Sequence, residues 1–214
     1  MKGLVLVVVI AIASTGVRRA EAGDCDGEAD ALHGLLAGEA RRASRWNVAW
    51  GVFYGAAVAG QLALALTETK PFATFDRDYE EMMYVGAAKA TVGVISKLVV
   101  PLRVRVPART ADACVDLIAL RRAVERNARR ERQSFYLNHF GGLAVNLAGV
   151  AVLAARRGVG IAAQSFAIGF PVGIAATYSQ PRRAWKAWRA NRASWRTGVT
   201  AGDGATVLWL AGEL

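Results

Sequence analysis

The chain has 214 residues, of which 54% are hydrophobic, and it carries a formal net charge of +10. Long runs almost free of charge alternate with short blocks rich in arginine, a pattern typical of membrane-spanning segments joined by polar loops. Nucleic-acid binding, which the basic pI suggests, is disfavoured because the basic residues flank the apolar runs, where they can meet lipid phosphates, and do not form a stripe on a soluble domain.

The first residues have the layout of a secretory signal. A basic residue precedes an uncharged apolar stretch, and residues 20–22 (Ala-Glu-Ala) supply a small-x-small cleavage motif. A pair of arginines between that stretch and the cut is unusual, so an uncleaved anchor over residues 3–17 is the alternative. Such an anchor would reach only about 22 Å as a helix, short of a ~30 Å hydrocarbon core. We therefore favour a cleaved signal at residues 1–22, followed by a polar N-terminal segment at residues 23–46.

Four apolar segments are predicted to cross a membrane as two antiparallel hairpins. The first contains no charged residue, and the second contains only two lysines. The last two are joined by three residues, so they must lie antiparallel and adjacent. The spans are predicted at residues 47–66, 82–101, 139–155 and 159–179, in hairpins that cover residues 47–101 and 139–179. The expected fold class is all-α, an integral membrane four-helix bundle with amphipathic surface helices.

Two basic segments flank the second hairpin. Residues 102–138 are predicted to form a basic amphipathic connector helix, capped by Thr110, that lies on the membrane surface or stands off it. Residues 180–214 form a basic tail, in which three tryptophans share one face of a helix. Such a helix would lie in the membrane interface with its indoles in the acyl boundary and its cations at lipid phosphates. The residues assigned to this interface are Trp185, Trp188, Trp195, Arg182, Arg183, Lys186 and Arg189.

Two conflicting signals leave the orientation of the bundle open. Eighteen lysine and arginine residues lie on the side of the connector and the tail, against four on the opposite side, which predicts that the basic side faces the cytoplasm. A cleaved signal would put the same side outside the cell, whereas an uncleaved anchor agrees with the charge count. Cys25 and Cys114 are separated by two spans and share a compartment, so they could form a disulfide outside or stay reduced inside.

Lys89 is the most unusual residue of the predicted spans. It lies near the centre of its span, where an ionised side chain costs about 2.5–3.5 kcal/mol. No predicted span contains aspartate or glutamate, which argues against a proton-coupled transporter. Lys89 would then be hydrogen-bonded within the bundle, snorkel, or bind an anionic ligand; Lys97 is expected to snorkel. The candidate intramembrane polar site is Lys89, Tyr54, Gln61, Asn146 and Gln164.

No catalytic, cofactor-binding or metal-binding motif is evident in the sequence. The two histidines, His33 and His139, are too isolated for a metal cluster. We therefore expect a non-catalytic integral membrane protein of the bacterial envelope that organises lipids or a partner, without cofactor or nucleic acid. Its partners would be the lipid bilayer, including anionic lipids, and a second copy of the chain or another membrane protein. The alternative is a small channel or carrier for an anionic solute, built around Lys89.

Four stretches carry a resemblance that covers most of residues 40–190. They are RRASRWNVAWGVFYGAAVAGQ, VGAAKATVGV, NHFGGLAVNLAGVAVL and GFPVGIAATYSQPRRAWKAW. In composition and in the order of its segments, the chain resembles uncharacterised multi-span envelope membrane proteins of GC-rich bacteria, in which a signal peptide precedes about four helices. The resemblance favours a cleaved signal, and it implies no activity and no functional residues. From the predicted spans we expect a multi-pass location in the bacterial inner (cell) membrane.

Overall fold

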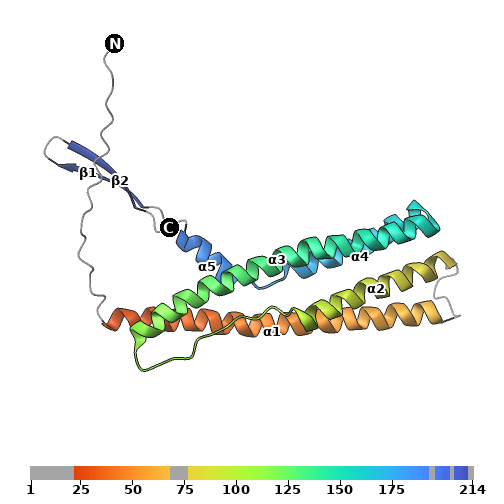
Figure 1. Ribbon diagram of the computed structural model, residues 1–214, viewed down its shortest axis with the longest axis horizontal. Coiled ribbons are helices and arrows are strands. Elements are labelled where there is room, and N and C mark those ends of the chain that lie inside the picture. The colour runs from red at the N-terminus through yellow and green to blue at the C-terminus, as the bar shows by residue number, and fades with distance from the viewer. Residues whose placement is uncertain (1–21, 68–76, 193–195, 203–204, 212–214) are drawn as a thin grey trace, which may run out of the picture.

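The computed structural model describes residues 22–67, 77–192, 196–202 and 205–211 of the chain (Figure 1). The helices of these ranges are α1 (Ala22–Leu66), α2 (Arg77–Val99), α3 (Ala113–Arg157), α4 (Val159–Tyr178) and α5 (Arg183–Arg192). Two strands follow, β1 (Arg196–Gly202) and β2 (Ala205–Ala211), which pair antiparallel with Arg196 opposite Ala211. The predicted signal at residues 1–22 falls almost wholly outside the described residues, and Trp195 lies outside them too.

The helices pack in pairs as two antiparallel hairpins, α1 with α2 and α3 with α4 (Figure 1). Each of these four helices is long and apolar enough to cross a membrane. The predicted all-α fold of two paired hairpins is therefore confirmed. The tight connection between α3 and α4 is a single residue, Gly158, whose φ of 86° favours glycine because side chains with a Cβ rarely adopt it.

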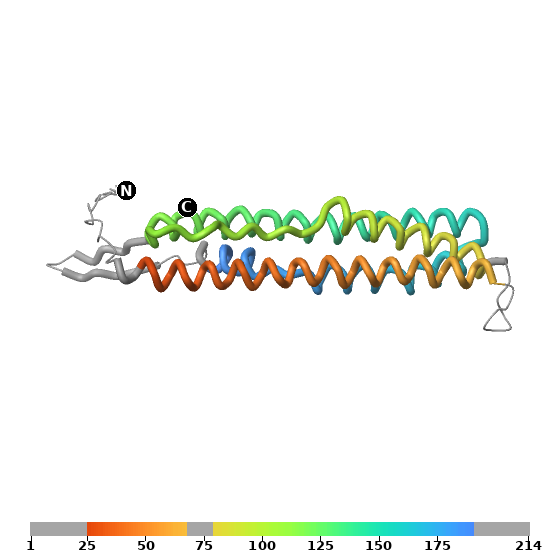
Figure 2. The backbone as a smooth tube through the Cα atoms, turned by 90° about the horizontal axis from the view of Figure 1, so that it is seen from below, coloured from red at the N-terminus to blue at the C-terminus, as the bar shows by residue number. Residues whose placement is uncertain are grey.

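The helices α1 and α3 are much longer than a membrane requires. Each has 45 residues and therefore reaches roughly 68 Å, more than twice a ~30 Å hydrocarbon core. Figure 2 shows both running along most of the bundle. Their polar halves project beyond the spans and form, with the linker and α5, a region that we call the stalk. It comprises residues 22–46, residues 100–137 and α5.

The continuity of these helices differs from the sequence prediction. Residues 23–46, expected as a separate polar segment, and the span after them form one helix, α1. The second half of the predicted connector likewise continues into the third span as α3. No proline interrupts either helix at its junction, so the change from polar to apolar residues marks the membrane boundary and not a helix end.

The linker between the hairpins, residues 100–112, is extended and not helical, unlike the predicted connector. Pro101 disfavours continuation of α2. Because an extended segment has no helical partners for its backbone, side chains supply them. Asn47 of α1 accepts from the backbone N–H of Leu102 at 3.1 Å and donates to its carbonyl at 2.9 Å. Asn127 of α3 does the same for Arg105, at 3.0 and 2.8 Å, so the linker is fastened along the stalk.

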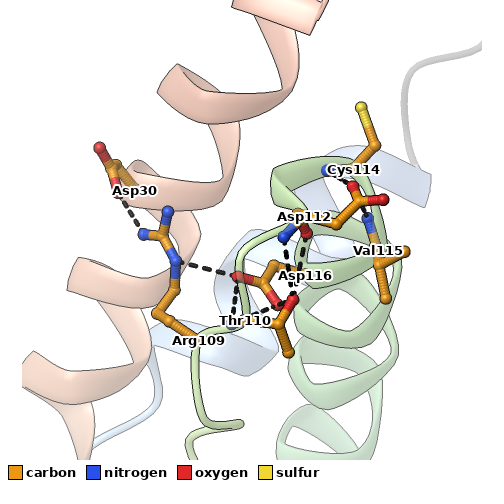
Figure 3. Close-up of polar contacts among 7 residues, drawn as sticks. All are labelled: Asp30, Arg109, Thr110, Asp112, Cys114, Val115 and Asp116. Carbon is orange, nitrogen blue, oxygen red and sulfur yellow. Dashed lines mark hydrogen bonds and ion pairs between the residues drawn. The ribbon is translucent and has the colours of Figure 1, made fainter.

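Asp112, and not the predicted Thr110, caps the start of α3 (Figure 3). Its carboxylate accepts from the backbone N–H groups of Cys114 and Val115 at 2.9 and 3.1 Å. Thr110 instead donates both its backbone N–H and its hydroxyl to the buried carboxylate of Asp116. These bonds, with the neighbouring Arg109, lower the pKa of Asp116, and Arg109 also pairs with an aspartate of α1, Asp30.

A small hydrophobic core holds the stalk together. Its buried members come from α1, α3 and α5 and include Leu36, Leu120 and Ala184. A disulfide joins Cys25 to Cys114 beside this core, with a Cα–Cα distance of 5.1 Å. It ties the start of α1 to the start of α3, at the end of the stalk remote from the spans (Figure 2).

Within the stalk, helix α5 packs against α3 and α1. The ring of Trp188 contacts the stalk core, so it does not lie in the acyl boundary expected from the sequence. Trp185 packs on Phe135 at a centroid distance of 5.8 Å and carries the guanidinium of Arg189 over its ring. Lys186 is exposed. The apolar face of α5 therefore meets protein, because a complementary apolar face of the stalk is available to it.

Candidate intramembrane binding site

A cavity of about 410 Å³ lies within the bundle and is lined by residues of all four spans. Most of its wall is apolar or glycine. Among the described residues, the two charged ones that line it are lysines of α2, and no aspartate or glutamate does. The polar side chains of the lining are Tyr54, Gln61, Lys89, Ser96, Lys97, Asn138, Asn146, Ser165 and Thr177.

The ammonium group of Lys89 is held by neutral oxygens. It donates to the hydroxyl of Ser165 at 2.9 Å, and longer contacts of 3.4 and 3.5 Å reach the carbonyl of Ser165 and the Oδ1 of Asn146. Among the described residues no carboxylate pairs with it. The charge of a buried cation that has only neutral partners is incompletely stabilised, because neutral dipoles only partly replace the hydration that it has lost. Such a group can therefore bind an anion.

Glycines on α3 and α4 make room for Lys89. A Cβ on Gly149 would lie 2.9 Å from its Cδ, and a Cβ on Gly169 would lie 3.0 Å from its Nζ and 2.5 Å from the Oδ1 of Asn146. Contacts this short do not occur between ordinary side chains. The lysine can therefore reach across the bundle only because both positions lack a side chain.

Two glycines of α2 receive side chains of α1 in the same way. Gln61 packs directly on Gly86, and the ring of Tyr54 would lie 2.8 Å from a Cβ on Gly93. These glycines stand three residues before and four residues after Lys89, which puts all three on one helix face. The helix face that carries Gly86, Lys89 and Gly93 is thus the face of α2 that packs on α1 and lines the cavity.

Four of the five predicted site residues line the cavity together. They are Lys89, Tyr54, Gln61 and Asn146, whereas Gln164 is exposed on α4 and does not line it. Its neighbour Ser165 contacts Lys89 instead. The signal that could have found Ser165 is its spacing of four and eight residues from Gly169 and Gly173, which puts it on the small-residue face of α4.

Lys97 does not snorkel as the sequence suggested. Its side chain is 7% exposed, and its ammonium donates to the Oδ1 of Asn138 at 3.1 Å. It also lies 3.9 Å from the ring centroid of Trp46, a cation–π contact that stabilises a desolvated charge. Eight residues separate it from Lys89, about 12 Å along α2. The two lysines therefore mark the middle of the cavity and its stalk end.

Two buried carboxylates lie above the cavity, where α5 begins. Glu39 of α1 accepts from the backbone N–H of Arg183 at 2.8 Å, and Glu131 of α3 accepts from that of Trp185 at 2.7 Å. Both side chains are fully buried. They satisfy N–H groups that the first turn of α5 cannot pair internally, which explains why α5 docks at this place.

Comparison with known proteins identifies no relative of the chain. No protein-family model matches it, and no curated protein and no solved structure is significantly similar to it. The resemblance to multi-span envelope proteins stays a prediction.

Proposed function

We propose that the chain is a non-catalytic multi-span membrane protein that binds an anionic molecule in the cavity between its two hairpins. The observation that carries the proposal is the charge of the lining, two lysines without an acidic residue. Charged groups within membranes are costly and commonly mark ligand or ion sites. The apolar remainder of the wall suits a ligand with an apolar part, so the ligand class is an anionic amphiphile.

We place the stalk on the outer side of the bacterial inner membrane. The Cys25–Cys114 disulfide supports this side, because disulfides persist in oxidising compartments and are rare in the cytosol. The predicted cleaved signal agrees with it. The excess of basic residues in the stalk argues for the other side, but four of the described arginines there, Arg42, Arg109, Arg121 and Arg129, pair with acidic residues. Arg109 and Arg121 pair with acidic residues of α1.

Binding is tested with octyl phosphate as the probe and the full chain in nanodiscs of neutral lipid. Isothermal titration, with empty nanodiscs as the blank, should show a saturable site that depends on Lys89. Lys89→Met should weaken it at least tenfold, because the ammonium is replaced by an apolar group of similar length. Lys186→Met removes an exposed lysine outside the cavity and should leave the affinity unchanged. Equal affinities for all three proteins would refute the proposal.

A carrier or channel for an anionic solute is the second candidate. It is favoured by the position of Lys89 near the middle of a span, with Lys97 eight residues nearer one end. A binding protein and a carrier differ in whether the anion crosses. Release of octyl phosphate from sealed liposomes that contain the wild-type chain, abolished by Lys89→Met, would select the carrier; binding without release would select the binding protein.

A further inference from the structure

A second charged hollow, of about 350 Å³, lies at the base of the stalk. It is bounded by α1 and by the turn that joins α4 to α5, and it shares no lining residue with the bundle cavity. Its lining is dominated by arginines from two segments far apart in the sequence. The lining residues are Arg42, Arg45, Arg182, Arg183, Glu39 and Trp46, with Ser179 and Pro181.

The hollow lies at the level where the spans leave the membrane. The indole N–H groups of Trp46 and Trp50 both donate to the hydroxyl of Ser179, at 3.2 and 3.0 Å. Ser179 directly follows the last residue of α4, and the tryptophans stand where α1 turns from polar to apolar. Tryptophan is enriched at this depth because its ring is amphipathic. The hollow therefore faces the headgroup region.

The arginines of the hollow exceed its acidic groups by three. Glu39, the carboxylate among the lining residues, accepts from the backbone of Arg183 and lies 3.9 Å from the guanidinium of Arg42. Arg182 stacks over Phe135 at 4.7 Å, which leaves most of its N–H groups unused. In the part of the chain that the structure describes, no carboxylate pairs with the side chain of Arg45 or of Arg183.

We propose that this hollow binds the headgroup of an anionic glycerophospholipid. Guanidinium groups match phosphate oxygens with two parallel hydrogen bonds, and basic pockets at the membrane boundary are typical sites for anionic headgroups. The exposed apolar surface next to the hollow favours a lipid headgroup over free phosphate as the ligand. Val48 and Val52 are 63% and 67% exposed and stand three and seven residues after Arg45, on the same helix face. An acyl chain can lie along them while the phosphate contacts the arginines.

The test uses the full chain in a neutral detergent, with short-chain phosphatidylglycerol, phosphatidylcholine of equal chain length and inorganic phosphate as probes. Native mass spectrometry should detect one tightly bound phosphatidylglycerol and much weaker binding of the other two. Arg45→Gln combined with Arg183→Gln should weaken phosphatidylglycerol binding at least tenfold. The charge-matched control is Arg122→Gln with Arg126→Gln, which removes two exposed arginines of the stalk and should change the affinity less than twofold.

The site is independent of the bundle cavity, so Lys89→Met should retain phosphatidylglycerol. Equal weakening by the two double variants would show a diffuse charge effect and overturn the proposal. Loss of the lipid from the Lys89→Met variant alone would show that the lipid binds in the bundle cavity, which would also overturn the proposal. If inorganic phosphate binds as tightly as the lipid and is lost with Arg45→Gln and Arg183→Gln, the hollow is a site for free phosphate and the lipid proposal fails.

Discussion

Protonation of Glu131 should control how firmly α5 docks on the stalk. Burial, followed by the negative charge of Glu39, raises the pKa of Glu131 to about 7. One oxygen of each carboxylate has no hydrogen-bond partner among the described residues, and the guanidinium of Arg42 lies 3.9 Å from Glu39. A proton on Glu131 relieves both the desolvation and the repulsion. We therefore expect tighter docking in mild acid than in mild alkali.

The magnitude follows from linkage. A carboxyl group with a raised pKa binds its proton more tightly in the docked state, so its contribution is fully present below the ordinary value of 4.5 and is lost as the pH rises through about 7. At about 1.4 kcal/mol per pKa unit, this shift corresponds to roughly 3 kcal/mol, or a change of a few hundredfold in the docking equilibrium.

Hydrogen exchange of the backbone amide of Trp185 in the full chain in nanodiscs measures this directly. After correction for the intrinsic dependence of exchange on pH, protection should fall between pH 5 and pH 8. Glu131→Gln keeps an oxygen acceptor but does not titrate, so its protection should be nearly independent of pH. Glu125→Gln, on the same helix, should behave as the wild type. Protection of the Trp185 amide that does not depend on pH in the wild type, or an unchanged pH dependence in Glu131→Gln, would refute the role of Glu131.

Three further predictions follow from the packing. Gly149→Ala should weaken octyl phosphate binding, since its methyl group would meet Lys89 at 2.9 Å. Gly60→Ala, at an exposed position of α1 that does not line the cavity, should not weaken it; equal titration curves for the two variants would contradict this. Cys25→Ser should lower the unfolding temperature of the stalk. The loss of unfolding free energy should be smaller than the ~4–5 kcal/mol that loop entropy gives for a free chain, because the first two spans already restrain the same loop; an unchanged thermal unfolding curve under oxidising conditions would count against it. Asn127→Ala should lower the free energy of unfolding by about 1–3 kcal/mol, because it removes two hydrogen bonds to the linker. It should also raise hydrogen exchange at Arg105; unchanged exchange there would show that another group protects this amide.

The spans and much of the site could be predicted from the sequence because both depend on local patterns. Uncharged runs of membrane length identify the spans, and the spacing of Gly86, Lys89 and Gly93 identifies the inward face of α2. The prediction nevertheless missed Lys89's partner on α4, because Gln164 and Ser165 are adjacent polar residues and only the spacing of Ser165 from Gly169 and Gly173 separates them. The burial of Lys97 could not be foreseen from any such pattern, because it depends on Trp46 of another helix.

The stalk was the less predictable part, because its contacts are long-range. A change from polar to apolar residues looks like an element boundary, yet α1 and α3 continue through it. The docking of α5 depends on Glu39 and Glu131, which lie 144 and 54 residues from the N–H groups that they accept from. A basic helix rich in tryptophan has the same sequence pattern whether it lies on lipid or on protein, so only the presence of a complementary surface decides between them.

The most direct test of the intramembrane site is a crystal structure of the full chain with 8-bromooctyl phosphate. Data collected at the bromine absorption edge locate the alkyl tail, and the phosphate density locates the head. The proposal predicts a bromine peak among the apolar residues of the bundle cavity and the phosphate within hydrogen-bond distance of the Nζ of Lys89. A cavity that stays empty while the probe occupies other surfaces, or a probe whose phosphate points away from Lys89, would contradict it.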